Sequence, residues 1–368
     1  MQKYYDIEEK PKKAFLVSIL KDGEHELPGL VQTLGLEIAG FERINVREKS
    51  PKFGMGSGKA AELAQKAADL QADCIIFDWE PSPSQQRNWE DLSGIPIIDR
   101  QELIIQIFAQ RASTREAELQ VKLAELSYFL PRLSHKYIDL SRQRGGRYGT
   151  RGSGETRLET DRRAIEQRIR RLEKEIEDIR KQRQTQRRQR ERHGLPVCAI
   201  VGYTNAGKSS LLNAMTGADV PAEDKLFVTL DAVTRRFEPS PGSPVLLTDT
   251  VGFIRRLPHS LITAFRSTLE EAAMADILIH ILDASEPDID IYYQTTFSVL
   301  GELGAQNIPM ITVLNKIDRL DNNGDPQDLL DELKSRFPES IAVSVKNGTG
   351  LDILKDKIAA MVHALAKT

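Results

Sequence analysis

Residues 202–210 read GYTNAGKSS, and this stretch decides how the second half of the chain folds. It fits the pattern G-x-x-x-x-G-K-S, follows the apolar run CAIV and precedes SLLNAM, which has helical composition. Glycines at these positions let backbone N–H groups converge on a phosphate, and the helix N-terminus adds a favourable dipole. The stretch therefore predicts a phosphate-binding loop between a strand and a helix, since an accidental glycine-rich turn would lack this context.

Three side chains of this loop have distinct predicted roles. Lys208 supplies a positive charge toward the β- and γ-phosphates of a nucleotide, and the hydroxyl of Ser209 can ligate Mg²⁺. Asn205 can help to coordinate K⁺, or its side chain can simply stabilise the turn. The sequence leaves both roles of Asn205 open.

Two later segments have the order and spacing of the switch regions of a GTPase. FVTLD at 227–231, here called switch I, offers the Thr229 hydroxyl to complete the shell of Mg²⁺, and DTVGF at 249–253 follows the strand-like run VLLT. Asp249 would hold Mg²⁺ through a water molecule, and the Gly252 N–H would meet the γ-phosphate. The predicted metal-site residues are Ser209, Thr229 and Asp249.

Two further segments decide which base is bound. NKID at 315–318 follows ITVL, and the Asp318 carboxylate can accept hydrogen bonds from both N1–H and the 2-amino group of guanine. Adenine presents neither donor, so this motif favours GTP and GDP over ATP, and SVK at 344–346 would close the base pocket with backbone contacts. The predicted GTP-binding residues are Gly202, Tyr203, Thr204, Asn205, Ala206, Gly207, Lys208, Ser209, Ser210, Phe227, Val228, Thr229, Leu230, Asp231, Asp249, Thr250, Val251, Gly252, Asn315, Lys316, Ile317, Asp318, Ser344, Val345 and Lys346.

The predicted catalytic set is small and consists of Lys208, Thr229 and Gly252. Many relatives of Ras place a glutamine directly after the glycine of D-x-x-G, where it orients the attacking water. This chain has Phe253 there, and a phenyl ring cannot make the required hydrogen bonds. We therefore expect slow intrinsic hydrolysis, with the water positioned by the backbone, by a rearranged switch or by a partner.

Apolar runs on both sides of these motifs predict a multidomain α/β fold. In residues 195–368, β-branched runs separated by helical segments are typical of a doubly wound parallel sheet in a P-loop GTPase domain. Residues 1–100 alternate strand-like and amphipathic segments, which predicts a smaller parallel α/β domain. Residues 101–194 carry heptad spacing on both sides of a glycine-rich stretch, which predicts a long antiparallel helical hairpin. Pro131 should break its first helix, and its second should begin near Glu155.

The stretch between the heptad runs is flexible and basic. GGRYGTRGSGETRLETDRR at 145–163 has five glycines and two arginines in its first ten residues. Residues 142–193 hold 18 Lys/Arg and 9 Asp/Glu, a local charge of +9, although the whole chain carries only −3. A flexible tip at 142–154 suits the phosphates of an RNA, and a solvated helix with internal ion pairs is the alternative. The predicted RNA contacts are Arg142, Arg144, Gly145, Gly146, Arg147, Arg151, Gly152 and Arg157.

The remaining composition is typical of a cytoplasmic monomer. Of the 368 residues 40% are hydrophobic, yet no apolar run reaches the roughly 18 to 20 residues of a membrane helix, and the N-terminus lacks a signal-peptide core. Cys74 and Cys198 lie in apolar runs and should be buried, free thiols. KFGMGSGKAAE at 52–62 lacks the spacing and the GK[ST] ending of a phosphate loop, so an ATP site, a loop–helix turn and an RNA contact stay open there.

Taken together, these motifs resemble the HflX family of GTPases. The resemblance rests on GGRYGTRGSGETRLETDRR, GYTNAGKSS, LFVTLD, DTVGFIRRLP and NKID, and it covers nearly the whole chain, including IIDRQELIIQIFAQRA at 97–112. It implies a nucleotide-binding-like α/β domain, a helical hairpin and a GTPase domain, in a protein that binds the large ribosomal subunit and its rRNA. Bacterial members split stalled or idle ribosomes under stress, and some members bind ATP through the N-terminal region. Ser153 and Arg157 depart from the proline and glutamine common in the family, and the C-terminal extension of some members is lacking.

Three functions follow as hypotheses. The first is a GTP hydrolase that binds the large ribosomal subunit, is stimulated by it and splits ribosomes, with the GTP state controlling binding and release. The second is a ribosome-assembly GTPase that acts on immature large subunits with the same catalytic residues. The third is an RNA-binding protein that a nucleotide merely stabilises, which the intact set of Lys208, Ser209, Thr229 and Asp249 argues against. An ATP-driven RNA-remodelling role of the N-terminal domain has the least support.

Overall fold

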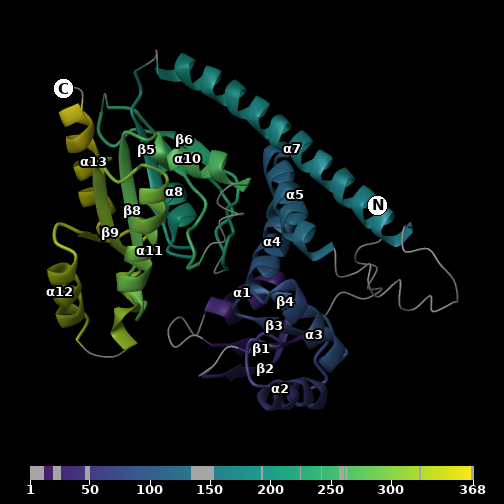
Figure 1. The fold of residues 1–368 in the computed structure, drawn as a ribbon. Helices are drawn as coiled ribbons and strands as arrows, with labels where there is room; N and C mark the ends of the chain where they lie inside the picture. Colours follow the sequence, from purple (N-terminus) through teal and green to yellow (C-terminus); the bar gives the residue numbers. More distant parts are fainter. Residues whose placement is uncertain are drawn as a thin grey trace, which may run out of the picture. The chain divides into compact units, whose positions relative to one another are not determined.

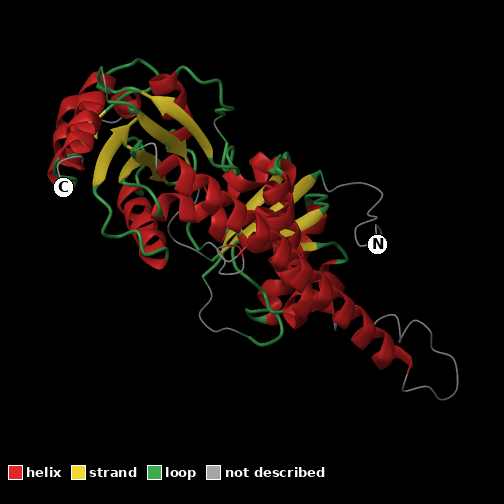
Figure 2. Cartoon of the chain, turned by 90° about the horizontal axis from the view of Figure 1, so that it is seen from above, coloured by secondary structure: helices red, strands yellow, loops and turns green. Residues whose placement is uncertain are grey.

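The structure is a computed structural model, and the described residues fall into two compact units. It describes residues 12–19, 26–45, 50–133, 153–191, 194–223, 225–241, 243–256, 261, 264–322 and 325–365, without the side chains of 153–158, 184, 186–191 and 266–268. One unit comprises Met1–Gln110 with Val121–Lys174, and the other comprises Arg111–Gln120 with Glu175–Thr368. Each unit has its own sheet (Figure 1), and in both the strands are flanked by helices (Figure 2). Among the described helices, none combines the length and the apolar character that a membrane crossing requires.

The first unit contains a four-stranded parallel sheet with the order β2-β1-β3-β4. Its elements are β1 (Lys13–Ser18), α1 (Glu26–Leu34), β2 (Glu37–Arg43), α2 (Ser57–Asp69), β3 (Cys74–Phe77), α3 (Pro83–Ser93) and β4 (Ile97–Asp99). Phe15 and Ile75 on one face of the sheet pack with Leu63 of α2 and Trp89 of α3. The predicted alternation of strands and helices is confirmed, and α1 is an element that was not predicted.

Helix α3 shows why these predictions succeed. Ser82 Oγ accepts a hydrogen bond from the Gln85 N–H at 3.2 Å, and the Gln85 side chain accepts one from the Ser82 N–H at 2.9 Å. Pro83 occupies the first turn, where its missing N–H costs nothing, and Gly94 ends the helix with φ +71°. The helix therefore begins where the sequence SPSQ predicts.

The middle of the chain is helical, but its first arm is not one continuous helix. The elements are α4 (Arg100–Arg111), α5 (Arg115–Phe129), the 3-10 turn η1 (Leu130–Arg132) and α7 (Ser153–Glu191). Pro131 lies in the 3-10 turn, so the predicted break is confirmed, but residues 112–114 also interrupt the arm. Helix α7 begins at Ser153, two residues before the predicted start, which places Thr156 inside the helix and not at its cap. Its 39 residues span about 58 Å.

The second unit contains a six-stranded sheet with the order β10-β9-β8-β5-β7-β6. Its strands are β5 (Val197–Gly202), β6 (Val233–Phe237), β7 (Val245–Asp249), β8 (Ile277–Asp283), β9 (Met310–Asn315) and β10 (Ile341–Ala342). Its helices are α8 (Lys208–Thr216), α10 (Arg266–Ala273), α11 (Ile289–Glu302), the 3-10 helix η2 (Ile317–Asn322), α12 (Pro326–Arg336) and α13 (Leu351–Leu365). The predicted doubly wound fold is confirmed. Strand β6 was not predicted because it is an antiparallel edge strand whose Arg235 and Arg236 are exposed.

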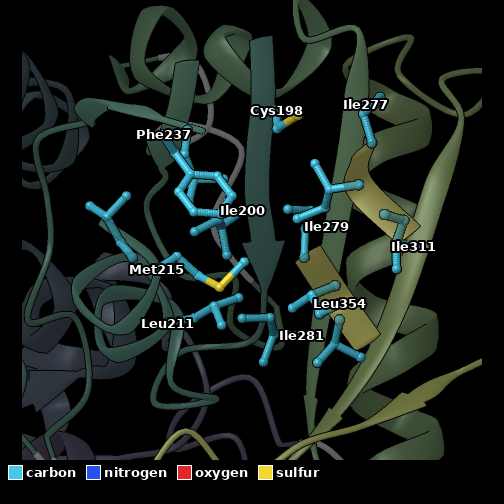
Figure 3. Close-up of a cluster of buried hydrophobic side chains, with 14 of the residues drawn as sticks. Cys198, Ile200, Leu211, Met215, Phe237, Ile277, Ile279, Ile281, Ile311 and Leu354 are labelled. Carbon is cyan, nitrogen blue, oxygen red and sulfur yellow. The ribbon is translucent and has the colours of Figure 1, made fainter. Parts of the chain in front are cut away.

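Helices cover both faces of this sheet, which explains the continuous apolar strands. On one face, Ile200 of β5 and Ile279 of β8 pack with Leu211 of α8 and Leu354 of α13 (Figure 3). The opposite face packs against α11 and α12 around Leu282. Strands that are buried on both faces need apolar residues at successive positions, as VCAIV and ILIHILD show.

The two cysteines are buried, free thiols, as predicted. Cys74 lies in β3 and Cys198 in β5, and neither is exposed to solvent. Burial raises the pKa of both thiols to about 12, so they remain protonated and unreactive at neutral pH.

His280 is a polar side chain in the middle of the apolar strand β8. It is completely buried, its ring lies beside Tyr293 and Phe297 of α11, and neither ring nitrogen has a hydrogen-bond partner within the described part of the chain. Burial, helped by the positive charge of Lys208, lowers the pKa of His280 to about 3. The imidazole is therefore neutral in the folded protein at physiological pH.

Acid should destabilise the second unit through His280. The unfolded chain binds a proton at this histidine near pH 6.5, whereas the folded chain binds it only near pH 3. The contribution of His280 to the free energy of unfolding is therefore fully present above pH 6.5. It falls by about 1.4 kcal/mol per pH unit as the pH drops toward 3. In urea unfolding at pH 7, 6 and 5, His280→Leu should remove this slope, and the exposed His363→Gln should retain it. The same slope in His280→Leu and the wild type would contradict the assignment.

Candidate nucleotide-binding site

The phosphate-binding motif lies where β5 ends and α8 begins. Gly202 is the last residue of β5, and Gly207 is the N-cap residue of α8 with φ +100°. A Cβ at Gly207 would lie 2.3 Å from Nδ2 of Asn315, and one at Gly202 would lie 2.3 Å from the carbonyl oxygen of Ile281. Neighbouring strands therefore approach this loop so closely that only glycine fits at these two positions.

Lys208 is the buried cation of the loop. Its Nζ donates a hydrogen bond to the carbonyl oxygen of Tyr203 at 2.8 Å. Burial lowers the pKa of Lys208 to about 8, although the negative charge of Asp249 acts in the opposite direction. The loop lines a cavity of about 50 Å³ together with residues 227–229 of switch I and Gly252. A phosphate in this cavity would stabilise the ammonium form of Lys208.

Three oxygen-bearing side chains meet beside Lys208 and form a set of ligands that suits Mg²⁺. Ser209 Oγ lies 2.6 Å from Thr229 Oγ1 and donates a hydrogen bond to Asp249 Oδ2 at 2.6 Å. Asp249 is fully buried, and its Oδ1 has no hydrogen-bond partner among the described residues. Burial raises the pKa of Asp249, and the positive charge of Lys208 acts in the opposite direction, as a bound cation would. Hard oxygen ligands with one carboxylate are what Mg²⁺ prefers, and the three predicted metal-site residues fit this ion.

Backbone hydrogen bonds attach both switch segments to the phosphate loop. The Phe227 N–H donates to Thr204 Oγ1 at 2.7 Å, and the Thr204 N–H donates to the Phe253 carbonyl at 2.8 Å. The Phe253 N–H in turn donates to the Gly202 carbonyl at 3.1 Å. Phe253 is only 1% exposed and is not among the residues that line the cavity, so its side chain packs in the core while its backbone anchors the segment.

The close approach of the D-x-x-G segment also explains its glycine. A Cβ at Gly252 would lie 2.7 Å from Thr204 Cα and 2.8 Å from Lys208 Nζ. No side chain fits there without moving the loop or the lysine. Gly252 therefore lines the cavity beside Lys208, and the contact of its N–H with the γ-phosphate stays a prediction.

Asn315 connects the base-recognition segments to the phosphate loop. Its Nδ2 donates to the Ala206 carbonyl at 2.9 Å, and its Oδ1 accepts from the Val345 N–H at 3.2 Å. Ser344 Oγ donates to Asp318 Oδ1 at 2.5 Å, which orients the carboxylate. The two predicted base-pocket segments are therefore held together, and both are joined to the loop.

Lys316 joins the NKID segment to the end of the neighbouring strand β8. It adopts φ +63°, and its ammonium pairs with Asp283 at 2.7 Å. Asp283 also accepts hydrogen bonds from the backbone and hydroxyl of Ser285. Asp283 was not predicted, although it ends the strand ILIHILD beside the NKID segment.

The other predicted site residues do not all reach the cavity. Thr250 donates its hydroxyl to the Ile200 carbonyl at 2.7 Å, and Leu230 and Val251 are buried, so these three support the fold around the site. Asp231 bonds to residues outside the motifs, as described below. The predicted tip contacts Arg142, Arg144, Gly145, Gly146, Arg147, Arg151 and Gly152 lie outside the described residues, and of Arg157 only the backbone, in α7, is described.

The glycine-rich segment of the first unit has the geometry of a loop–helix turn. Gly56 is the N-cap residue of α2 and makes no side-chain cap. Lys59, the candidate phosphate ligand, pairs with Glu42 at 3.2 Å and with Glu62 at 2.9 Å. Its charge is already neutralised, so the loop–helix turn is the alternative that these contacts favour.

The arrangement in the second unit defines a class of protein. A phosphate loop with a buried lysine, a magnesium-type set of ligands and an N-K-x-D segment beside it belong to a P-loop GTPase.

Comparisons with known proteins agree with the assignment to the P-loop GTPases. Residues 21–109, 111–190 and 197–316 match the families described as GTP-binding GTPase N-terminal, GTP-binding GTPase Middle Region and 50S ribosome-binding GTPase. The chain is 48% identical to the GTPase HflX of Akkermansia muciniphila, covering 98% of this chain and 87% of the relative. It is 45% identical to the GTPase HflX of Caldanaerobacter subterraneus subsp. tengcongensis, covering 94% and 80%. A crystal structure of SsGBP with GDP is 28% identical, with a TM-score of 0.54 over 96% of this chain and 99% of that one. The chain belongs to the HflX family of GTPases and is a GTP hydrolase.

Proposed function

We propose that this GTPase binds the large ribosomal subunit through its basic hairpin and splits stalled or idle ribosomes, with the GTP state controlling binding and release. The observation that carries the proposal is the ion pair between the basic helix α7 and helix α10 of the GTPase domain. Arg180 of α7 pairs with Glu270 of α10 at 2.7 Å, and α10 follows the D-x-x-G segment in the chain. The match of residues 197–316 to 50S ribosome-binding GTPases supports the same partner.

In this proposal the residues around the cavity have different roles in hydrolysis. Lys208 and the backbone N–H groups of the loop bind the β- and γ-phosphates, and the Gly252 N–H meets the γ-phosphate. Bound Mg²⁺ supplies positive charge to the phosphate oxygens from a site formed by Ser209, Thr229 and Asp249. Because Phe253 cannot orient water, intrinsic hydrolysis is slow and the large subunit stimulates it.

The Asn205 side chain has a proposed role of its own. Asn205 lines the cavity and adopts φ +63°. Its side-chain oxygen would help to hold K⁺ beside the phosphates. Hydrolysis should therefore be faster in KCl than in NaCl, and Asn205→Ala should lose this difference. Equal rates in the two salts would leave Asn205 with only its role in the turn.

Deleting the tip should separate ribosome binding from nucleotide binding. A chain with residues 142–154 replaced by a short Gly-Ser linker should lose at least tenfold in affinity for large subunits, because the basic residues that neutralise rRNA phosphates are gone. Its GTP affinity should stay within twofold, since no cavity residue is changed. Sedimentation with purified large subunits at fixed salt measures the first quantity, and nucleotide titration measures the second.

Comparable sedimentation of the deleted and intact chains would refute the proposed contact. Density gradients of mature ribosomes incubated with the intact chain and GTP test whether the protein splits ribosomes. Conversion of 70S particles to free subunits supports splitting, and binding confined to immature large subunits would favour the assembly role instead.

A further inference from the structure

A contact outside the cavity fixes the end of switch I. Asp231, two residues after Thr229, accepts hydrogen bonds from Ser113 Oγ at 2.9 Å and from Thr114 Oγ1 at 2.5 Å, each on a different carboxylate oxygen. Ser113 and Thr114 lie between α4 and α5, in a segment that belongs to the same compact unit as the cavity. None of the sequence motifs points to this contact.

The Thr114 hydroxyl has a defined direction. Its oxygen accepts a hydrogen bond from the Ala117 N–H at 3.2 Å, which makes Thr114 the N-cap residue of α5. A carboxylate only accepts, so the single hydroxyl proton is directed to Asp231. Hydrogen bonds to a charged acceptor are among the stronger ones in proteins. The position of Asp231 is therefore tied to the first turn of α5.

The same turn is anchored to the rest of the unit by ion pairs. Glu116 pairs with Arg183 of α7 at 2.8 Å, and Arg183 also lies 3.7 Å from Glu271 of α10. Just before the loop, Arg111 pairs with Glu223 at 3.4 Å. The start of α5 therefore cannot follow a large movement of switch I without breaking one of these pairs.

We propose that Ser113 and Thr114 form a latch that positions the metal-site residue Thr229 through Asp231. Switch I is then held at both ends, by the Phe227 N–H on Thr204 and by Asp231 on the latch, with the Thr229 hydroxyl 2.6 Å from Ser209 between them. Two residues of extended chain reach only about 7 Å, so a fixed Asp231 keeps Thr229 within about that distance. The conformation of switch I thus depends on the helical region as well as on the nucleotide. The latch residues act through Asp231 and are positioning residues.

The test measures the order of switch I directly. In the nucleotide-free protein, Ser113→Ala/Thr114→Ala should speed amide hydrogen exchange in residues 227–231 at least tenfold. The Mg²⁺ concentration for half-maximal binding of a GTP analogue should rise at least threefold, because Thr229 is less often in place. The single variant Thr114→Ser keeps the hydroxyl at position 114 and leaves Ser113 unchanged, so it should behave like the wild type.

Two further variants distinguish loss of the contact between the latch and Asp231 from loss of a helix N-cap. Ser82→Ala removes the N-cap of α3, the same chemical change in a helix of the other unit, and should leave exchange at 227–231 unchanged. Asp231→Ala keeps the Thr114 cap of α5 and should loosen switch I as the double variant does. Unchanged exchange at 227–231 in Ser113→Ala/Thr114→Ala and Asp231→Ala, or equal acceleration in Ser82→Ala, would overturn the proposal.

Discussion

Replacing Lys208 by methionine should lower kcat/KM for GTP hydrolysis by at least about a thousandfold, or about 4 kcal/mol. The ammonium group is buried beside the cavity, where its interaction with phosphate is weakly screened. Methionine keeps most of the side chain's apolar volume but removes the charge and the hydrogen bond to the Tyr203 carbonyl. The loss should therefore fall on nucleotide binding and catalysis more than on folding. Steady-state hydrolysis with saturating Mg²⁺ measures it.

A second lysine gives a matched control for this substitution. Lys355 lies on α13 of the same unit and pairs only with Asp352, at 3.1 Å, among the contacts of the described residues. Lys355→Met should retain activity within twofold. Retention of more than a tenth of the wild-type rate in Lys208→Met, with an unchanged melting temperature, would contradict the role assigned to the buried charge.

The parallel strands and the phosphate loop of the second unit could be predicted because their motifs are short and follow strands. The glycines lie at the end of β5 and before α8, Lys208 and Ser209 begin α8, and Asp249 ends β7 on the neighbouring strand. Parallel strands bring their carboxyl ends to one edge, so motifs that follow strands must meet there. The structure adds that Asn315 from β9 crosses to the Ala206 carbonyl and joins the base segments to the loop.

Features that depend on long-range contacts could not be predicted in the same way. The edge strand β6 and the stacking of Tyr203 on Tyr292, with ring centroids 3.9 Å apart, have no periodic signature. The interruption of the first helical arm had only a weak signal in the sequence, since Ser113 and Thr114 are residue types that favour helix N-caps. Its meaning for switch I emerges only when Asp231 is found beside it.

The hydrophobic residue after D-x-x-G is explained by packing. The sequence shows only that Phe253 cannot orient water. The structure shows its backbone paired with Gly202 and Thr204 on both sides and its ring in the core. These contacts attach the residue next to Gly252 to the phosphate loop, so Phe253 has a packing role at the position where relatives of Ras have glutamine.

Replacing Asp318 by asparagine should change the preferred base from guanine to xanthine. In the predicted pocket the carboxylate would accept hydrogen bonds from N1–H and the 2-amino group of guanine, whereas the asparagine amide offers one acceptor and one donor. Xanthine has a carbonyl oxygen at position 2, which accepts from that donor while N1–H still finds the amide oxygen. GTP affinity should fall by about a thousandfold, because a buried donor then faces the 2-amino group unpaired.

Competition of GTP, XTP and ATP against a fluorescent nucleotide tests this exchange, with a guanine nucleotide as the probe for the wild type and a xanthine nucleotide for Asp318→Asn. XTP should become the strongest competitor for Asp318→Asn, and ATP should stay weak for both proteins because adenine lacks N1–H. Ser344 Oγ still has an acceptor in the asparagine side chain, so the pocket keeps its shape. Asp356→Asn, which removes the same charge from an exposed position of α13, should leave the order of competitors unchanged. A uniform loss of all three nucleotides in Asp318→Asn would show that the carboxylate supports the pocket and does not read the base.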